Sequence, residues 1–154
     1  MPFPVNLLRI LLGALSLCAA DMVAAPQEVG IAVIINAGAA PPRLTRDQLM
    51  LIFERKKTFW DDGQRIHPVN LSASHPLRHA FSVQVFGREP EDLDEYWRDM
   101  YFHGVLPPFV LASEEAVIRF VVKTPGAIGY VSACLADRRV IVLLRMDSAT
   151  NCPR

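Results

Sequence analysis

Four polar residues lie close together in the sequence where a helix is expected to begin: Ser72, Ser74, His75 and Arg78. The first turn of a helix has backbone N–H groups without partners and a partial positive charge, so it attracts anions. The hydroxyls and the guanidinium would add donors to such a site. Pro76 weakens it, because proline has no N–H to donate. The stretch therefore predicts weak binding of an inorganic oxyanion, with a dissociation constant of roughly 0.1 mM or higher.

Other reactive side chains have simpler explanations. His75 and His79 are four residues apart, a spacing that can present two nitrogens to zinc, but no third ligand is visible nearby. The carboxylate pairs Asp61-Asp62 and Glu91-Asp92 are typical of a turn and of a helix start. The sequence has neither a nucleophile elbow nor a glycine-rich phosphate loop. We therefore expect no metal, no cofactor and no enzymatic activity.

Residues 1–20 have the features of a secretory signal peptide. Arg9 leads into an apolar run, and small residues follow that run. The run is too short to span a bilayer comfortably. Cleavage is expected after Ala20 rather than after Ala25, which would leave a proline at the new N-terminus. The remaining chain is then one periplasmic domain over residues 26–154, without a membrane-spanning segment.

Charge and cysteine content fit an exported protein. The whole chain has 16 basic and 16 acidic residues, and only one arginine among them lies in the signal. A nearly neutral protein without a basic patch is not expected to bind nucleic acid. Export leaves two cysteines, Cys134 and Cys152, which favour a disulfide in an oxidising compartment. Such a bridge would close a loop of about eighteen residues and stabilise the fold by roughly 3 kcal/mol.

Hydrophobic patterning predicts one α/β domain. Strands are expected at 29–36, 66–71, 127–132 and 140–144, and helices at 44–53, 76–86, 89–101 and 113–123. The almost continuous apolar run at 29–36 is typical of a central strand buried on both faces. At 154 residues, the chain is long enough for a single core.

Three helices have clear signals. Thr45 and Gln48 form a capping box, and either Ser74 or His75 can cap the second helix. The third has an apolar stripe at core spacing, which predicts that it is buried: Leu93, Tyr96, Trp97, Met100 and Tyr101.

Several of these stretches, taken in order, resemble the phosphate-binding periplasmic proteins of ABC transporters and the small exported proteins related to one lobe of them. The matching pieces are VIIN at 33–36, LTRDQL at 44–49, WDDG at 60–63, PVN at 68–70, FHG at 102–104 and TPGAIGY at 124–130. The resemblance covers most of residues 29–132. It implies a single three-layer α/β lobe like one domain of a type 2 periplasmic binding protein, in a family that captures oxyanions between two lobes.

The chain departs from this family in two respects. The family's Ser-Gly-Thr motif is absent at 72–78, and only one lobe's worth of chain is present. A ligand could then be enclosed only if a partner protein or a second copy supplied the other wall. We therefore expect an exported solute-binding-like protein with weak oxyanion affinity. The alternative is a ligand-free periplasmic interaction or accessory module that has kept the fold.

Overall fold

The computed structural model describes residues 30–40 and 42–146. Its elements in order are β1 (Ile31–Asn36), α1 (Arg46–Phe53), β2 (His67–Leu71), α2 (Pro76–Phe86), the 3₁₀ turn η1 (Glu91–Leu93), α3 (Asp94–Phe102), β3 (Phe109–Leu111), α4 (Glu114–Lys123), β4 (Ala127–Ser132) and β5 (Val140–Met146). The predicted signal peptide and Cys152 lie outside the described residues. The Cys134–Cys152 bridge therefore stays a prediction.

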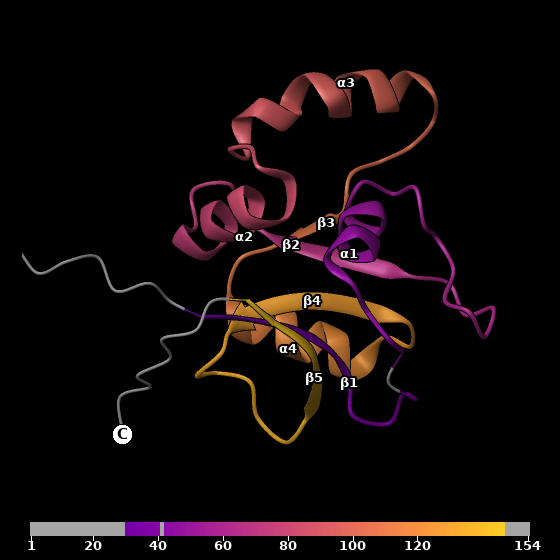
Figure 1. The fold of residues 1–154 in the computed structure, drawn as a ribbon, viewed down its shortest axis with the longest axis vertical. Coiled ribbons are helices and arrows are strands. Elements are labelled where there is room, and N and C mark those ends of the chain that lie inside the picture. Colours follow the sequence, from indigo (N-terminus) through magenta and orange to yellow (C-terminus); the bar gives the residue numbers. More distant parts are fainter. Residues whose placement is uncertain (1–29, 41, 147–154) are drawn as a thin grey trace, which may run out of the picture.

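The strands form one mixed sheet in the order β3-β2-β4-β1-β5 (Figure 1). Strand β2 runs parallel to both β3 and β4, whereas β1 runs antiparallel to β4 and β5. Residues 31–35 of β1 are all buried. This confirms the expected central strand, and the prediction of an α/β fold is also confirmed.

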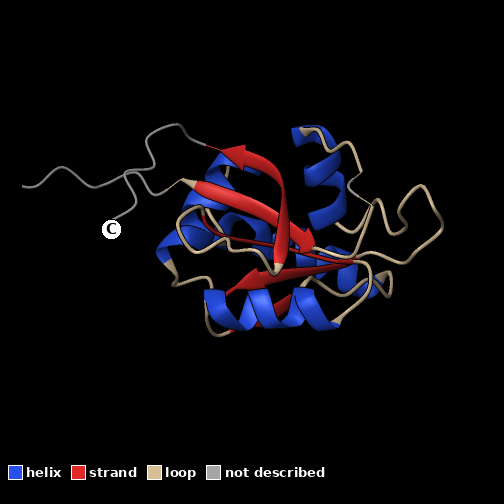
Figure 2. Ribbon diagram, turned by 90° about the horizontal axis from the view of Figure 1, so that it is seen from below, coloured by secondary structure: helices blue, strands red, loops and turns tan. Residues whose placement is uncertain are grey.

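Helices cover both faces of the sheet, and two neighbouring residues of β4 show how. Successive side chains of a strand point to opposite faces. A Cβ at Gly129 would lie 2.5 Å from the Val117 side chain of α4, so α4 packs directly on that face. On the other face, Tyr130 stacks on Phe81 of α2 with ring centroids 3.8 Å apart, and Phe53 of α1 lies beside it. Figure 2 shows the sheet between these two helical layers.

Local signals set the helix starts as expected. The Thr45 hydroxyl accepts from the Gln48 N–H, and the Gln48 side chain accepts from the Thr45 N–H. His75 caps α2, and Gly87 ends that helix with a φ of 67° in the left-handed region. Within the described residues, no helix has the length and apolarity needed to cross a membrane.

The expected burial of the third helix is wrong for α3 itself, although Leu93, the first residue of the predicted stripe, is buried in η1. No residue of α3 is buried, Trp97 is only half-buried, and Tyr101 is 64% exposed. Figure 1 shows α3 standing apart from the sheet. Its link to the rest of the domain includes the Tyr96 hydroxyl, which donates to the Glu54 carbonyl just after α1 at 2.8 Å. Within α3, the domain therefore covers the stripe only in part, at Tyr96, Trp97 and Met100.

Candidate anion site at the start of helix α2

Strand β2 delivers the chain to a tight turn at residues 72–75, and α2 begins directly after it. The turn is closed by a hydrogen bond of 2.9 Å from the His75 N–H to the Ser72 carbonyl. The Ser72 and Ser74 hydroxyls lie 3.0 Å apart and share a hydrogen bond. Three of the predicted residues, Ser72, Ser74 and His75, are thus brought together in one loop, which we call the α2 loop (residues 72–75).

The helix offers few unused backbone donors to this loop. The Leu77 N–H donates to Nδ1 of His75 at 3.2 Å, and the Arg78 and His79 N–H groups both donate to the His75 carbonyl. Pro76 has no N–H. An anion would therefore meet mainly the serine hydroxyls, the positive end of the helix and the Nε2–H that a neutral His75 carries when its Nδ1 accepts.

Arg78 lies one turn further on and is buried, with 7% of its surface exposed. Its guanidinium donates to Oδ1 of Asn70 in β2 at 3.1 Å, and the Tyr130 hydroxyl of β4 donates to the same oxygen at 3.2 Å. Arg78 forms no ion pair with any described residue. A guanidinium in this position has neutral neighbours and an unbalanced positive charge.

Tyr130 supports this arrangement as a neutral phenol. Burial raises the pKa of Tyr130 to about 12, although the nearby charge of Arg78 and the hydrogen bond from the Leu71 N–H act in the opposite direction. At neutral pH, the hydroxyl therefore keeps its proton and donates it to Asn70 while accepting from Leu71 at 3.3 Å. The charged arginine is therefore held next to two neutral polar side chains.

Sequence reasoning found the loop residues and Arg78 but missed the two side chains that position the arginine. Asn70 is a polar residue between the apolar Val69 and Leu71, which was a usable signal, whereas Tyr130 is indistinguishable by pattern from an ordinary core residue. His79 points elsewhere and pairs with Glu89. Among residues 30–40 and 42–146, no three His, Cys, Asp or Glu side chains are grouped as a metal would need.

Solved structures with the same fold include two from phosphate transport. One is a protein from Clostridium perfringens described as a phosphate ABC transporter substrate-binding protein and solved with bound phosphate. It is 24% identical, with a TM-score of 0.62, over 75% of this chain and 44% of that one. The chain has the fold of a domain of the phosphate ABC transporter substrate-binding proteins. The second is an ABC-type phosphate transport receptor from Vibrio cholerae, 23% identical with a TM-score of 0.58 over 75% of this chain and 45% of that one.

This chain spans less than half the length of either phosphate-transport protein. No protein-family model and no curated protein matches the sequence. At this level of identity, the likeness establishes the fold, and the chemistry of the α2 loop has to be argued from the residues of this chain.

Proposed function

We propose that this protein is an exported, periplasmic solute-binding-like protein that binds an inorganic oxyanion, with phosphate the first candidate, at the α2 loop. The observation that carries the proposal is the buried guanidinium of Arg78, which has no acidic partner among the described residues. A bound anion would supply the missing counter-charge. The phosphate-transport relatives are described as a binding protein and a receptor, which favours binding over catalysis.

The physical argument rests on the cost of a buried charge. Taking a guanidinium out of water costs several kcal/mol, and neutral hydrogen-bond partners return only part of that. Asn70 and Tyr130 are such partners. An oxyanion at the nearby helix N-terminus would interact with the charge of Arg78, the helix dipole and the hydroxyls of Ser72 and Ser74 at the same time.

The same geometry predicts that the binding is weak. His75 already occupies the Leu77 N–H, and Pro76 offers none. The region that matches this chain covers less than half of each of the two phosphate-transport proteins, so a wall that encloses the anion would have to come from another molecule. Without that wall, the anion competes with water, and we expect a dissociation constant of roughly 0.1 mM or higher, equivalent to about 5–6 kcal/mol at most.

Calorimetric titration of the exported protein with phosphate and with sulfate tests the proposal. Replacing Arg78 by methionine removes the charge while filling its space, and should weaken phosphate binding by about tenfold or more, as loss of a charge-assisted contact does. Arg88→Met is the control, because Arg88 lies exposed just after α2 and should not affect binding. Micromolar phosphate binding that survives Arg78→Met would contradict the proposed site.

A second candidate function is a ligand-free interaction module, and a specific surface favours it. Large apolar side chains are exposed in one segment that includes the end of α3 and β3: Tyr101, Phe102, Leu106, Phe109 and Val110. Strand β3 is also the edge of the sheet, where backbone groups are open to pairing. A protein partner or a second copy could dock there.

Sedimentation velocity separates the two candidates. If the interaction module is the function, the protein should associate through this segment, Phe102→Asp should reduce association, and millimolar phosphate should give no calorimetric heat. Phosphate binding by a monomer that is unaffected by Phe102→Asp would instead favour the anion site.

A further inference from the structure

A cavity of about 570 Å³ lies at the other end of the sheet from the α2 loop. Three segments line it: residues at the end of β1 and in the loop after it, the hairpin turn at 60–64, and residues 125–127. Strand β4 begins at this cavity with Ala127, whereas the α2 loop follows the last residue of β2. Because β2 and β4 are parallel, the cavity and the α2 loop lie at opposite ends of these strands. The cavity has no part in the proposed phosphate site.

The lining has a clear chemical character. Its walls are largely apolar, with Ile35, Pro42 and the indole of Trp60 among them, and its polar side chains are carboxylates and amides. None of the lining residues is a lysine, arginine or histidine. An anion would find no counter-charge here, whereas a ligand with an apolar body and a positive group would find both kinds of contact.

The hairpin that holds Trp60 is fixed by several hydrogen bonds. The Trp60 backbone N–H donates to the Gln64 carbonyl at 2.8 Å, and the Trp60 indole Nε1–H donates to the Gly126 carbonyl at 3.1 Å. Gly126 has a φ of +76°, and a Cβ there would lie 2.1 Å from the Arg65 carbonyl oxygen, so only glycine allows this approach. The cavity wall is therefore formed in advance of any ligand.

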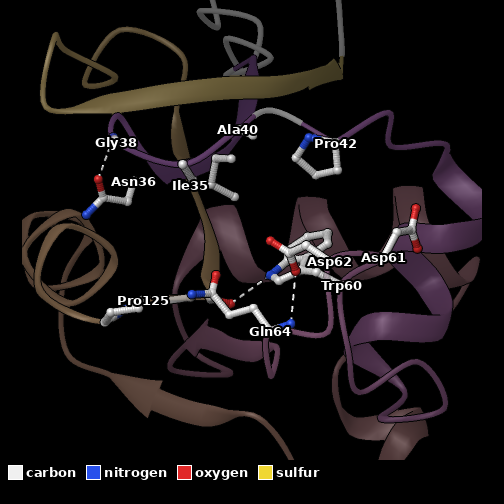
Figure 3. A pocket seen from close by; sticks show the side chains of 13 residues that line it. Ile35, Asn36, Gly38, Ala40, Pro42, Trp60, Asp61, Asp62, Gln64 and Pro125 are labelled. Atoms are coloured by element: carbon white, nitrogen blue, oxygen red, sulfur yellow. Dashed lines mark hydrogen bonds between the residues drawn. The ribbon is translucent and has the colours of Figure 1, made fainter.

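The two acidic residues of the cavity differ in their availability. Asp61 forms an ion pair with Lys57 at 2.8 Å. Asp62 has no ion pair within the described part of the chain, and its Oδ1 accepts the Gln64 N–H at 2.9 Å. Asp62 is exposed at the turn, and Figure 3 shows it in front of or behind Trp60 in the middle of the view, whereas Asp61 lies to one side.

We propose that this cavity binds a small organic cation, a protonated amine carried on a flat apolar body. Asp62 supplies the counter-charge, and the Trp60 ring supplies an apolar face that also attracts a cation. A volume of about 570 Å³ is ample for a ligand of this size. The protein would then have one site that prefers anions and one that prefers cations, at opposite ends of the strands of one sheet.

Tryptophan fluorescence tests this directly, because the chain has two tryptophans and Trp97→Phe leaves Trp60 as the only reporter. The probes are 2-phenylethylamine, 2-phenylethanol and phenylacetate, which share one ring and differ in charge. The amine should give a saturable change, the alcohol should bind about tenfold more weakly or worse, and phenylacetate should be weaker still.

Asp62→Asn is the decisive variant, because the amide keeps an oxygen to accept the Gln64 N–H while losing the charge. It should reduce amine affinity to the level of the alcohol and leave the alcohol's affinity unchanged. Asp94→Asn, at an exposed carboxylate at the start of α3, is the matched control and should change nothing. Equal binding of amine and alcohol, unchanged amine binding in Asp62→Asn, or no saturable response to millimolar amine would each overturn the proposal.

Discussion

Arg78 is the residue at which the needs of folding and of ligand binding diverge. For stability alone, a buried guanidinium with neutral partners is a poor choice, because apolar residues of similar volume often serve as well or better. Its hydrogen bond to Asn70 holds the charge in place but does not neutralise it. A residue that costs stability and offers charge beside a helix N-terminus is consistent with the proposed anion site.

We predict that Arg78→Met leaves the free energy of unfolding unchanged or raises it by up to about 4 kcal/mol. Methionine fills the space, and the Asn70 oxygen still accepts from Tyr130. Urea unfolding measures this, alongside the phosphate titration of the same variant. A loss of several kcal/mol would show that Arg78 is mainly structural.

Tyr130 leads to a prediction at alkaline pH. Its pKa is raised from 10.0 to about 12 by burial, so the folded state holds the proton more tightly than the unfolded state. The stability that comes from the neutral phenol is fully present below about pH 10 and is lost as pH rises toward 12, by about 2–3 kcal/mol in total. Urea unfolding across this range should show the loss, and Tyr130→Phe should lack it. An identical alkaline loss in both proteins would contradict this assignment.

At the scale of elements, the sequence predicted features that depend on neighbouring residues. It did not predict whether distant parts of the chain cover the apolar face of a helix. The Thr45 capping box, the His75 cap and the buried run of β1 depend on neighbouring residues, and the sequence contains all of that information. Whether the stripe of α3 is covered depends on where distant elements lie, which periodicity does not encode. The three-residue strand β3, directly after Pro107 and Pro108, is too short for any pattern to indicate.

The candidate site followed the same rule. The α2 loop was predictable because its hydroxyls and its helix start are adjacent in sequence. The neutral partners of Arg78 were not fully predictable, because Tyr130 reaches Asn70 only through the pairing of β2 with β4. The Trp60 cavity likewise depends on contact between segments far apart in the chain.

A matched pair of substitutions tests the different burial of the two helices. Phe81 of α2 is fully buried and stacks on Tyr130, so Phe81→Ala should cost about 3–5 kcal/mol. Trp97 of α3 is half-buried, so Trp97→Ala should cost only about 1–2 kcal/mol despite its larger side chain. Chemical denaturation gives both values. A cost for Trp97→Ala equal to that of Phe81→Ala would mean that α3 is covered in solution.

At the scale of the whole molecule, the α2 loop lies at the end of the sheet where β1 begins and β5 ends. The start of β1 and the end of β5 meet at this end, since Ile31 pairs with both Ser132 and Met146. The two phosphate-transport proteins have more than half of their length beyond the region this chain matches. An open site at this end explains why we expect weak binding and why a second molecule could strengthen it.

The most direct test of the anion site is to map phosphate binding onto the backbone amides by NMR. Titration of the isotope-labelled protein should shift the amides of residues 72–75, 77 and 78 in a saturable way at millimolar phosphate. The hairpin at 60–64 and helix α4 should stay unchanged and serve as internal controls. Arg78→Met should move the midpoint of these shifts to a phosphate concentration about tenfold higher or more. Saturable shifts concentrated elsewhere, or none at residues 72–78 with millimolar phosphate, would contradict the account.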